Sequence, residues 1–354
     1  MIRNVAIIGA GIGAEHLAAY LSLPDKFSVT CICDLNSDRA RGIAAPHQIT
    51  TVDDLAVVLA DDSLDIVDIC LPPHLHLQAM LSALDANKTV ICEKPLVTCL
   101  ADADTLAAKI EATNGVVYPV FQYRYGPGTT GLRALIEAGL AGRCFAGSLE
   151  THWNRDATYY AVDWRGTWAG EQGGALLGHA IHIHDLLTAL LGPVARIFAE
   201  VATRVNDIEV EDCAALSLKM ATGALITSSV TLGAANDSTR LRLMFEGFTV
   251  ESDHAAYAPA AAPWTFTARA PATQAAIDVV LANCAASDSG FQGFLGAIAD
   301  DLDGRKSWPV RLQDGRAAIE FVTAAYTSAR TGAPVELPIS QDVALYDGWL
   351  PETN

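Results

Sequence analysis

The sequence is poor in basic residues, and this limits the partners that the protein can have. Of 354 residues only 23 are Lys or Arg, against 41 Asp or Glu, so the formal net charge is −18 at pH 7. Because an acidic surface repels phosphate backbones and anionic lipid headgroups, we expect neither nucleic-acid nor membrane-surface binding. Hydrophobic residues make up 51% of the chain and charged residues only 18%, which excludes a disordered chain.

Long apolar runs and paired cysteines are also lacking. No run of about 18 uncharged apolar residues is present, which argues against a membrane-spanning helix. An apolar run near the N-terminus has some features of a signal peptide, but Glu15 and His16 interrupt it. None of the eight cysteines forms a C-x-x-C pair, and Cys31, Cys70 and Cys92 lie in apolar runs typical of strands. We therefore expect buried, reduced thiols in a cytoplasmic protein, with no disulfides.

The length of 354 residues favours two domains, because so long a chain rarely folds around a single hydrophobic core. In residues 1–122, short apolar runs alternate with helical stretches. We expect strands at 5–8, 29–33, 66–71, 89–92 and 116–120, and helices at 12–22, 53–60, 74–86 and 100–112. This alternation predicts right-handed crossovers and a doubly wound parallel sheet of the Rossmann type in an α/β protein.

From residue 123 to 335 the strand-like runs follow one another directly. They lie at 143–152, 195–204, 211–219, 224–232, 239–246 and 248–252, with helices expected at about 174–191, 290–303 and 313–331. The Ala- and Pro-rich segment 255–275 is typical of a loop. The pattern predicts an α+β domain with a large, mostly antiparallel sheet. Residues 336–354 are expected to form a C-terminal tail.

A glycine-rich turn follows the first predicted strand and opens the first helix. It fits the pattern G-x-G-x-x-G/A, with Ala14 in the last place. Gly9 permits the tight turn, Gly11 lets the backbone approach a pyrophosphate, and the small Ala14 lets the helix pack on the strand. We therefore expect Gly9, Gly11, Ile12 and Gly13 to bind a dinucleotide.

An acidic residue closes the second predicted strand. Asp34 lies 20 residues after Ala14, where a carboxylate can bind the ribose hydroxyls of NAD and repel a 2′-phosphate. NAD is therefore the expected cofactor, with NADP as the alternative because Arg39 is near enough to hold a phosphate. A second interpretation is a helix N-cap, for which Asp34 or Asn36 would serve equally well.

Three later segments carry a resemblance to a known family. Leu71-Pro72-Pro73-His74-Leu75-His76 follows the third strand, Glu93-Lys94-Pro95 follows the fourth, and a Gly-Gly…His-x-x-Asp helix runs from Gly173 to Asp185. In this order they resemble the family of glucose–fructose oxidoreductase and inositol dehydrogenase, over nearly the whole chain. The resemblance implies a cis peptide before Pro95. It also implies that the cofactor contacts Leu71, Pro72, His76, Glu93, Lys94 and Gln122, with Trp164 and Arg165 placed over it.

The same resemblance implies two catalytic residues, Lys94 and His182. Lys94 follows a buried strand whose end should face the nicotinamide, and its ammonium can stabilise a developing alkoxide. His182 is suited to take a hydroxyl proton near neutral pH. The alternatives are a surface lysine and a core histidine. The chain departs from the family at Gly178, four residues before His182, where relatives commonly carry an acid.

Polar and aromatic residues after the fifth strand suit the binding of a polyol. Rings stack on C–H faces, and amides or imidazoles bind hydroxyls. The candidates for substrate binding are Arg124, His152, Asn154, Tyr160 and His179. An exposed polar loop is the alternative interpretation.

A metal site is not expected in the histidine-rich helix. His179, His182 and Asp185 crowd it, but His184, two residues after His182, points away from the others. No Cys or Glu supplies a credible further ligand.

The sequence therefore predicts an NAD(P)-dependent oxidoreductase that transfers a hydride between nicotinamide and a hydroxyl or hemiacetal of a sugar, polyol or sugar derivative. Two alternatives remain open. One is a non-catalytic nucleotide-binding regulator, and the other is a glycosidase that holds NAD permanently. We further expect oligomerisation, because an open sheet face needs cover. The family resemblance implies that residues 123–335 bind the substrate and form a homodimer or homotetramer through the second sheet.

Overall fold

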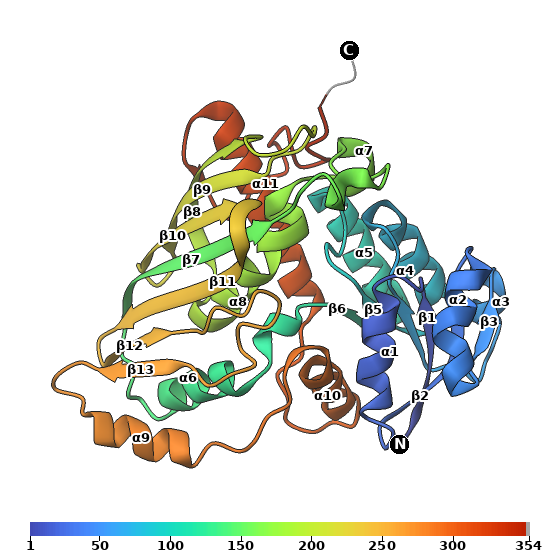
Figure 1. The fold of residues 1–354 in the computed structure, drawn as a ribbon, viewed down its shortest axis with the longest axis horizontal. Coiled ribbons are helices and arrows are strands. Elements are labelled where there is room, and N and C mark those ends of the chain that lie inside the picture. The colour runs from blue at the N-terminus through green and yellow to red at the C-terminus, as the bar shows by residue number, and fades with distance from the viewer. Residues whose placement is uncertain (352–354) are drawn as a thin grey trace. The chain divides into compact units, whose positions relative to one another are not determined.

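The computed structural model describes residues 1–351, and the last residues of the expected tail, 352–354, lie outside it. The chain divides into two compact units, each with its own sheet (Figure 1). The first unit consists of residues 1–120 and 291–316, and the second of residues 121–290 and 317–354.

The first unit is a six-stranded parallel sheet in the order β3-β2-β1-β4-β5-β6. Its strands are β1 (Arg3–Ile8), β2 (Phe27–Cys33), β3 (Thr50–Val52), β4 (Ile66–Ile69), β5 (Thr89–Cys92) and β6 (Val117–Pro119). This is the strand order of a dinucleotide-binding fold, with its switch point between β1 and β4. The predicted Rossmann sheet is confirmed. Every residue of β4 is buried, including Asp68, whose carboxylate is bound by His16 and Tyr20.

The helices of this unit connect successive strands. They are α1 (Gly13–Leu21), α2 (Ser37–Ala44), α3 (Leu55–Leu59), α4 (His76–Asp85) and α5 (Leu100–Thr113). Helix α2 and the short strand β3 were not predicted from the sequence. Three residues with little apolar content carry too weak a period-2 pattern to be recognised as a strand.

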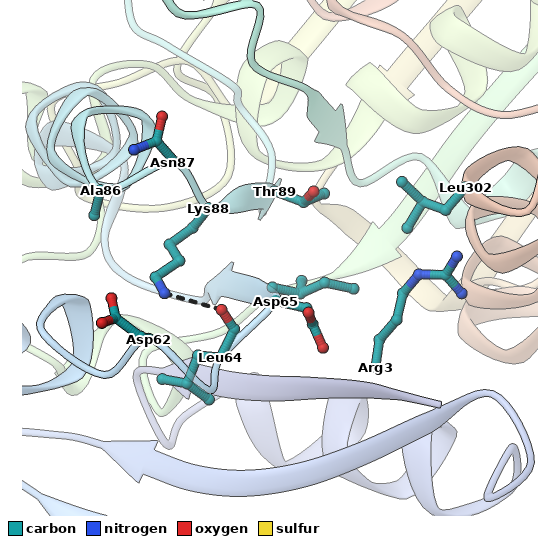
Figure 2. A pocket seen from close by; sticks show the side chains of 10 residues that line it. Arg3, Asp62, Leu64, Asp65, Ala86, Asn87, Lys88, Thr89 and Leu302 are labelled. Atoms are coloured by element: carbon teal, nitrogen blue, oxygen red, sulfur yellow. Dashed lines mark hydrogen bonds between the residues drawn. The ribbon is translucent and has the colours of Figure 1, made fainter. Parts of the chain in front are cut away.

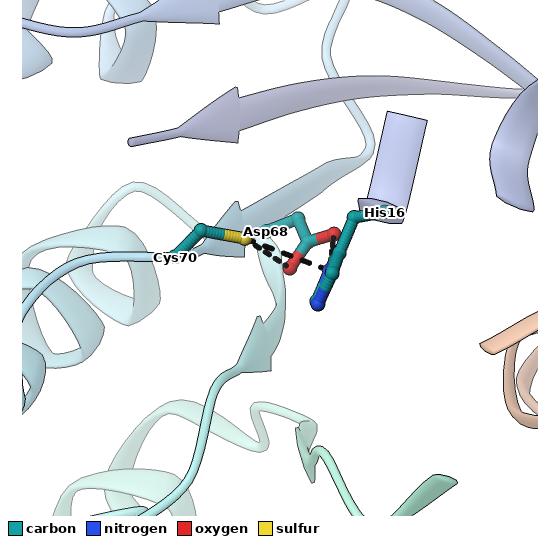
Figure 3. Close-up of side chains that lie close together, drawn as sticks. All are labelled: His16, Asp68 and Cys70. Carbon is teal, nitrogen blue, oxygen red and sulfur yellow. Dashed lines mark hydrogen bonds and ion pairs between the residues drawn. The ribbon is translucent and has the colours of Figure 1, made fainter. Parts of the chain in front are cut away.

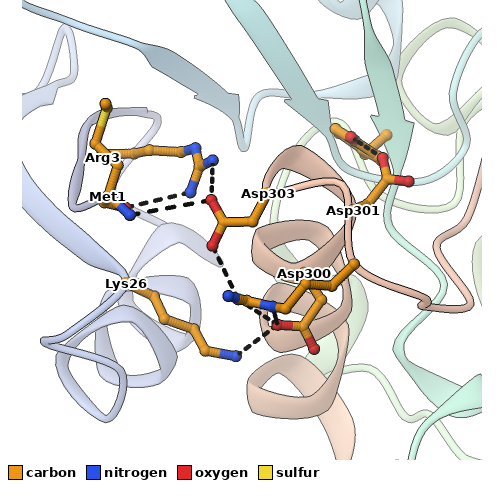
Figure 4. A network of polar contacts seen from close by, with 8 residues as sticks. Met1, Arg3, Lys26, Asp300, Asp301 and Asp303 are labelled. Carbon is orange, nitrogen blue, oxygen red and sulfur yellow. Dashed lines mark hydrogen bonds and ion pairs between the residues drawn. The ribbon is translucent and has the colours of Figure 1, made fainter.

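Helix α10 (Gly290–Leu302), predicted to belong with the second domain, groups with the first unit. Its acidic end faces basic residues near the N-terminus (Figure 4). Arg3 lies 2.6 Å from Asp303, and Lys26 lies 3.3 Å from Asp300. Residue 291 onwards therefore returns to complete the parallel-sheet unit.

The second unit contains an eight-stranded sheet in the order β13-β12-β11-β7-β10-β9-β8-β14. All neighbouring pairs are antiparallel except β7 and β10, so the predicted mostly antiparallel sheet is confirmed. Its strands are β7 (Cys144–Asn154), β8 (Val194–Ala202), β9 (Cys213–Met220), β10 (Leu225–Thr231), β11 (Gly233–Phe245), β12 (Phe248–Glu251), β13 (Thr265–Ala268) and β14 (Val335–Glu336).

Helices cover one face of this sheet. A π-helical turn (Leu176–Ala180) leads directly into α8 (Ile181–Leu191), in place of the uniform α-helix expected for residues 174–191. His184 of α8 reaches Ser228 of β10, and Ser328 of α11 (Leu312–Thr331) receives a hydrogen bond from the Ala199 amide of β8. Alternating exposure along β9 and β10 leaves the opposite face open to solvent.

Segments predicted as irregular contain regular structure. Residues 255–275 hold β13, and α6 (Pro127–Glu137), α7 (Trp168–Glu171) and α9 (Gln274–Ala282) were not predicted. Helix α6 contains Gly128 because a Cβ there would lie 2.3 Å from Nε1 of Trp264. Close packing therefore outweighs the poor helix propensity of its glycines and threonines.

One helical segment, Trp168–Leu191, is long and apolar enough to cross a membrane, but 78% of its most apolar window is buried in the protein. A core helix of a soluble protein passes the same test, so this segment is weak evidence for a membrane span. All eight cysteines are free, as expected, and five of them are buried.

Candidate functional site

The glycine turn lies at the carboxyl edge of the parallel sheet, at the switch point of the strand order. Gly9 has φ +102°, and a Cβ there would lie 2.4 Å from the carbonyl oxygen of Cys70. Nothing lies within 4 Å of the Cβ position of Gly11, so the turn is open to a ligand. A Cβ on Gly13 would lie 2.8 Å from a side-chain carbon of Ile7, so Gly13 allows α1 to pack closely on β1. The turn therefore fits the pyrophosphate of a dinucleotide.

Asp34 follows β2 at the same edge and contacts the turn directly. Its carboxylate accepts hydrogen bonds from the amides of Ala10 (2.7 Å) and Asn36 (2.8 Å), and a forked pair from Arg39. Burial alone would raise the pKa of Asp34, but Arg39 and the two amides lower it below the usual value. The N-cap of α2 is Asn36, which accepts from the Arg39 amide, so the capping interpretation of Asp34 is wrong.

Replacing Asp34 with serine is expected to weaken NADH binding about 10- to 100-fold, because a charge-assisted bond to the ribose is lost. The same change should strengthen NADPH binding, because Arg39 is released from its carboxylate partner and becomes free to bind a 2′-phosphate. Quenching of tryptophan fluorescence by each nucleotide measures both affinities. The control is Asp34→Ser combined with Arg39→Ala, in which the gain for NADPH should disappear; a gain that persists would contradict this role of Arg39.

The segment after β4 is held by a buried histidine. The two ring nitrogens of His76 lie 2.7 Å from the Leu71 carbonyl and 2.8 Å from the Pro95 carbonyl. Burial lowers the pKa of His76, and the two carbonyl groups only partly offset this. A neutral imidazole carries one N–H, so His76 donates to only one of these two carbonyls. The ring nevertheless lies between the loop after β4, which includes Pro72, and the loop after β5. Contact of His76 with the cofactor stays a prediction.

Glu93 and Lys94 follow β5 at the carboxyl edge of the sheet. The Lys94 amide donates to the Glu93 carboxylate at 3.0 Å, and the peptide between Lys94 and Pro95 is cis, as the family resemblance implied. The glycine turn, Asp34, Leu71 and Lys94 thus share one edge, where a parallel sheet of this type binds its ligand.

A pocket of about 480 Å³ in this unit lies at the opposite edge of the sheet (Figure 2). It is lined by residues at the amino ends of β1, β4 and β5, including Arg3, Ile66 and Thr89. Lys88 is already engaged there with the carbonyls of Asp61 and Leu64. This pocket contains none of the predicted site residues.

In the second unit, His182 lies on α8 and is only 4% exposed. Its ring stacks on Tyr123 with 4.7 Å between centroids and meets the edge of Phe121 at 6.0 Å. His184 lies on another side of the helix, stacked on Phe321, and burial lowers its pKa to about 3. His184 is therefore a neutral packing residue, pointing away from His182 as predicted.

Next to His179 lies an aromatic–arginine cluster, formed by Trp153, Arg155, Tyr159, Arg165 and Tyr257. The Tyr159 hydroxyl lies 3.4 Å from Nε2 of His179, and the Trp153 ring meets the His179 ring edge-on at 5.2 Å. The Arg155 guanidinium lies over Trp153 (4.8 Å) and Tyr159 (5.0 Å), and that of Arg165 lies 3.8 Å from the centre of Tyr159. Flat rings and forked donors of this kind suit a sugar or its charged derivative.

The other predicted substrate residues are distributed unevenly around this cluster. His152 hydrogen-bonds Ser229 on the open face of the sheet and is not brought to His179, whereas Trp153 is. Asn154 is exposed at the end of β7, and the Tyr160 ring packs edge-on against Tyr159 at 5.0 Å. Tyr159 was not predicted as a site residue, although the adjacent tyrosines Tyr159 and Tyr160 were a usable signal. Tyr257 lies in the segment predicted as a loop and gave no signal.

Arg124 and Gln122 belong to the short turn that follows residue 121. The Arg124 guanidinium makes a forked, buried ion pair with Asp185 of α8, at 2.8 and 2.6 Å. The amide oxygen of Gln122 is buried and has no hydrogen-bond partner within residues 1–351. Trp164 is 40% exposed beside Arg165. Their roles toward substrate or cofactor stay predictions.

A buried glutamate that sequence reasoning missed anchors the start of the histidine-bearing helix. The Glu211 carboxylate accepts hydrogen bonds from the amides of Gly174 (3.0 Å) and Leu176 (2.9 Å) and from the Tyr326 hydroxyl. Burial raises its pKa to about 7, although these donors favour the charged form.

The raised pKa of Glu211 predicts that stability falls as pH rises. Between about pH 4.5 and about pH 7 the unfolded state releases this proton and the folded state keeps it, which costs about 2 to 3 kcal/mol. Glu211→Gln should remove this contribution to the pH dependence of stability. Urea unfolding of both proteins at about pH 5 and about pH 8 measures the free energy of unfolding and would reveal the difference. The control is Glu200→Gln on an exposed position of β8. Equal pH dependence in wild type and Glu211→Gln would contradict the assignment.

Three buried side chains in the first unit are near enough to share a metal: His16, Asp68 and Cys70 (Figure 3). Their contacts are those of hydrogen bonds, with Nδ1 of His16 2.8 Å from Asp68. Burial raises the pKa of the Cys70 thiol to about 12, so a thiolate ligand is disfavoured. We assign no metal to this group.

Comparison with known proteins agrees with this geometry. Residues 3–121 match the model of an oxidoreductase family with an NAD-binding Rossmann fold, and residues 130–251 match that of the GFO/IDH/MocA C-terminal domain. A levoglucosan dehydrogenase of Pseudarthrobacter phenanthrenivorans is 28% identical over 215 residues, which is 58% of this chain and 55% of that protein. An inositol 2-dehydrogenase of Rhodococcus erythropolis is 35% identical over 145 residues, 40% of this chain and 41% of that protein. The aligned parts thus span about half the length of these relatives or less.

A solved structure is similar over almost the full chain. The WlbA dehydrogenase of Bordetella pertussis, in complex with NADH and UDP-GlcNAcA, has a TM-score of 0.83 and 25% identity, covering 96% of this chain and 100% of that one. The levoglucosan dehydrogenase complexed with NADH and levoglucosan has a TM-score of 0.78 at 21% identity, which shows a shared fold. With both matched domains and the cofactor edge in place, the chain belongs to the GFO/IDH/MocA oxidoreductase family and carries its NAD-binding Rossmann domain.

Proposed function

We propose that this protein is an NAD-dependent dehydrogenase that acts on a secondary hydroxyl or hemiacetal of a sugar, polyol or sugar derivative. The observation that carries the proposal is the position of Lys94. It follows β5 at the same sheet edge as the glycine turn and Asp34, where the nicotinamide end of a bound dinucleotide is expected. An ammonium at this edge suits a reaction in which an oxygen gains negative charge.

The proposed roles divide between two side chains. When bound, NAD supplies the hydride acceptor. His182 takes the proton from the substrate hydroxyl, and Lys94 donates a hydrogen bond to the same oxygen. The stacking of His182 on Tyr123 restricts the imidazole to one orientation, which favours directed proton transfer. Gly178 supplies no carboxylate, so the acid that relatives carry at this position is not available from this residue.

The aromatic–arginine cluster supports a sugar or an acidic sugar derivative as substrate. Nε of Arg165 is buried and has no hydrogen-bond partner within residues 1–351, so it can bind a substrate oxygen. The similar WlbA structure contains UDP-GlcNAcA, a nucleotide-linked sugar. We therefore include carboxylated and nucleotide-linked sugars among the candidate substrates, with Arg124, His152, Asn154, Tyr160 and His179 as the proposed binding residues.

The test is NADH formation, followed by absorbance, across a panel of inositols, aldoses, ketoses, levoglucosan, sugar acids and UDP-sugars. Each compound is tried with NAD and with NADP. Turnover with one group of compounds supports the proposal and names the substrate class. If NADH binds but no compound is oxidised or reduced, a non-catalytic regulator is favoured. Release of a sugar from a glycoside without net NADH would favour a glycosidase that holds NAD permanently.

We also propose a cytoplasmic homodimer or homotetramer formed through the open face of the eight-stranded sheet. Phe198 is 36% exposed and Leu225 is 60% exposed on β8 and β10. Burying such side chains against a second copy would remove apolar surface from water. Light scattering after gel filtration should give a multiple of 37.4 kDa. A monomer would contradict the assembly without affecting the proposed reaction.

A further inference from the structure

His16 lies on α1, just after the glycine turn, and is only 1% exposed. Each of its ring nitrogens faces a carboxylate. Nδ1 lies 2.8 Å from Asp68 of β4, and Nε2 lies 3.1 Å from Glu93, which follows β5. An ionised carboxylate can only accept hydrogen bonds, so both ring nitrogens must donate. The contacts therefore select the imidazolium form of His16.

The remaining neighbours of His16 supply no competing positive charge. Tyr20, on the same helix, donates its hydroxyl to Asp68 at 3.0 Å, and the Cys70 thiol of the β4 segment lies 3.5 Å from Nδ1. The ring of Phe291 from α10 packs at 4.5 Å. Burial alone would lower the pKa of His16, but Asp68 and Cys70 raise it well above the usual value. The imidazolium is thus compatible with its burial.

Glu93 connects this buried cation to Lys94. One carboxylate oxygen of Glu93 faces His16, and the other accepts the Lys94 amide at 3.0 Å. A glutamate side chain normally samples several rotamers, but a bond at each oxygen restricts it to one. The chain of contacts therefore runs from α1 through Glu93 to the backbone that carries Lys94.

We propose that His16 is a positioning residue: its imidazolium holds the Glu93 carboxylate, which in turn sets the orientation and the charge environment of Lys94. The inference rests on the proposed role of Lys94 in the reaction. If it holds, the two buried carboxylates lose their compensating cation when His16 is replaced. The additional negative potential then stabilises the Lys94 ammonium, whose pKa rises.

The test measures Lys94 directly and needs no substrate. Wild type and His16→Gln are labelled with limiting acetic anhydride from about pH 7 to about pH 10, and acetylation of Lys94 is quantified by peptide mass spectrometry. We expect the midpoint of Lys94 labelling to rise by about one pH unit in His16→Gln, that is, about tenfold slower labelling below the midpoint. His47→Gln, at an exposed histidine of the same unit, should behave as wild type.

Two outcomes overturn the proposal. The first is a His16→Gln protein that binds NADH as tightly as wild type and labels Lys94 with an unchanged midpoint. If His16→Gln does not fold, the protonation of His16 is measured in the wild type instead, by NMR of the ¹⁵N-labelled histidines. Among its nine histidines, one ring must keep both protons at about pH 8 and respond to Tyr20→Phe. If no ring does so, the proposal fails. A silent substrate panel would count against the proposed function alone, since neither measurement uses turnover.

Discussion

Replacing His182 with alanine is expected to lower kcat about 10²- to 10⁴-fold, the usual contribution of a general base. The imidazole is nearly buried and is oriented by the stacked ring of Tyr123, so no neighbouring water is expected to replace it efficiently. The steady-state rate of NADH formation is measured with the panel compound that gives the highest turnover. Affinity for NADH should remain within about twofold, because the glycine turn and Asp34, which we expect to bind most of the dinucleotide, lie in the first unit.

A control distinguishes loss of the base from a general effect of removing an imidazole. His254→Ala, at an exposed position of the second unit, should leave kcat unchanged. Tyr123→Leu should lower kcat less than His182→Ala, because it loosens the base but does not remove it. If His182→Ala keeps the full rate, the proton acceptor is another group, and His179 beside Tyr159 becomes the first candidate.

Replacing Arg124 with methionine is expected to destabilise the second unit by about 3 to 5 kcal/mol, because it removes the forked partner of a buried carboxylate. Arg124 and Asp185 have side chains only 2% and 1% exposed, and their two hydrogen bonds measure 2.8 and 2.6 Å. Thermal and urea unfolding, monitored by the fluorescence of the tryptophans, would measure the loss.

Two matched variants make this prediction specific. Arg143→Met breaks a solvent-exposed ion pair with Glu246 and should leave stability almost unchanged. Arg124→Met combined with Asp185→Leu removes both buried charges and should recover part of the loss. A cost below about 1 kcal/mol for Arg124→Met alone would show that Arg124 contributes little to stability, and its proposed role in substrate binding would then gain weight.

The fold was largely predictable because its first unit depends on local patterns. The apolar run Val5–Ile8 and the turn at Gly9 indicate their structure within a few residues. Helix α6 was not predictable, since Gly128 and Gly131 are disfavoured in helices unless a partner packs closely. Here Trp264 and Phe266, more than 100 residues later, provide that partner. Such a contact between distant segments leaves no periodic signal.

The candidate site was predictable where the chemistry is tied to strand ends, and less so elsewhere. Asp34 follows its strand directly, as predicted, and the structure adds a contact with the Ala10 amide of the turn. Tyr159, not the chosen Tyr160, reaches His179, because a shift of one residue turns a side chain to a different side of the backbone. Glu211 resembles any acidic residue at a strand start, and only the fold brings it under Gly174.

The discontinuity of the first unit has a consequence for protein synthesis. Ribosomes produce residues 1–120 first, yet Phe291, which packs on His16, and Asp303, which pairs with Arg3, come 171 and 183 residues after residue 120. The nascent Rossmann sheet therefore lacks these contacts, and one flank stays uncovered, while the second unit is translated. A fragment that ends near residue 122 would keep this flank uncovered permanently, so we expect it to aggregate, whereas the same fragment supplied with residues 290–316 as a separate peptide should remain in solution.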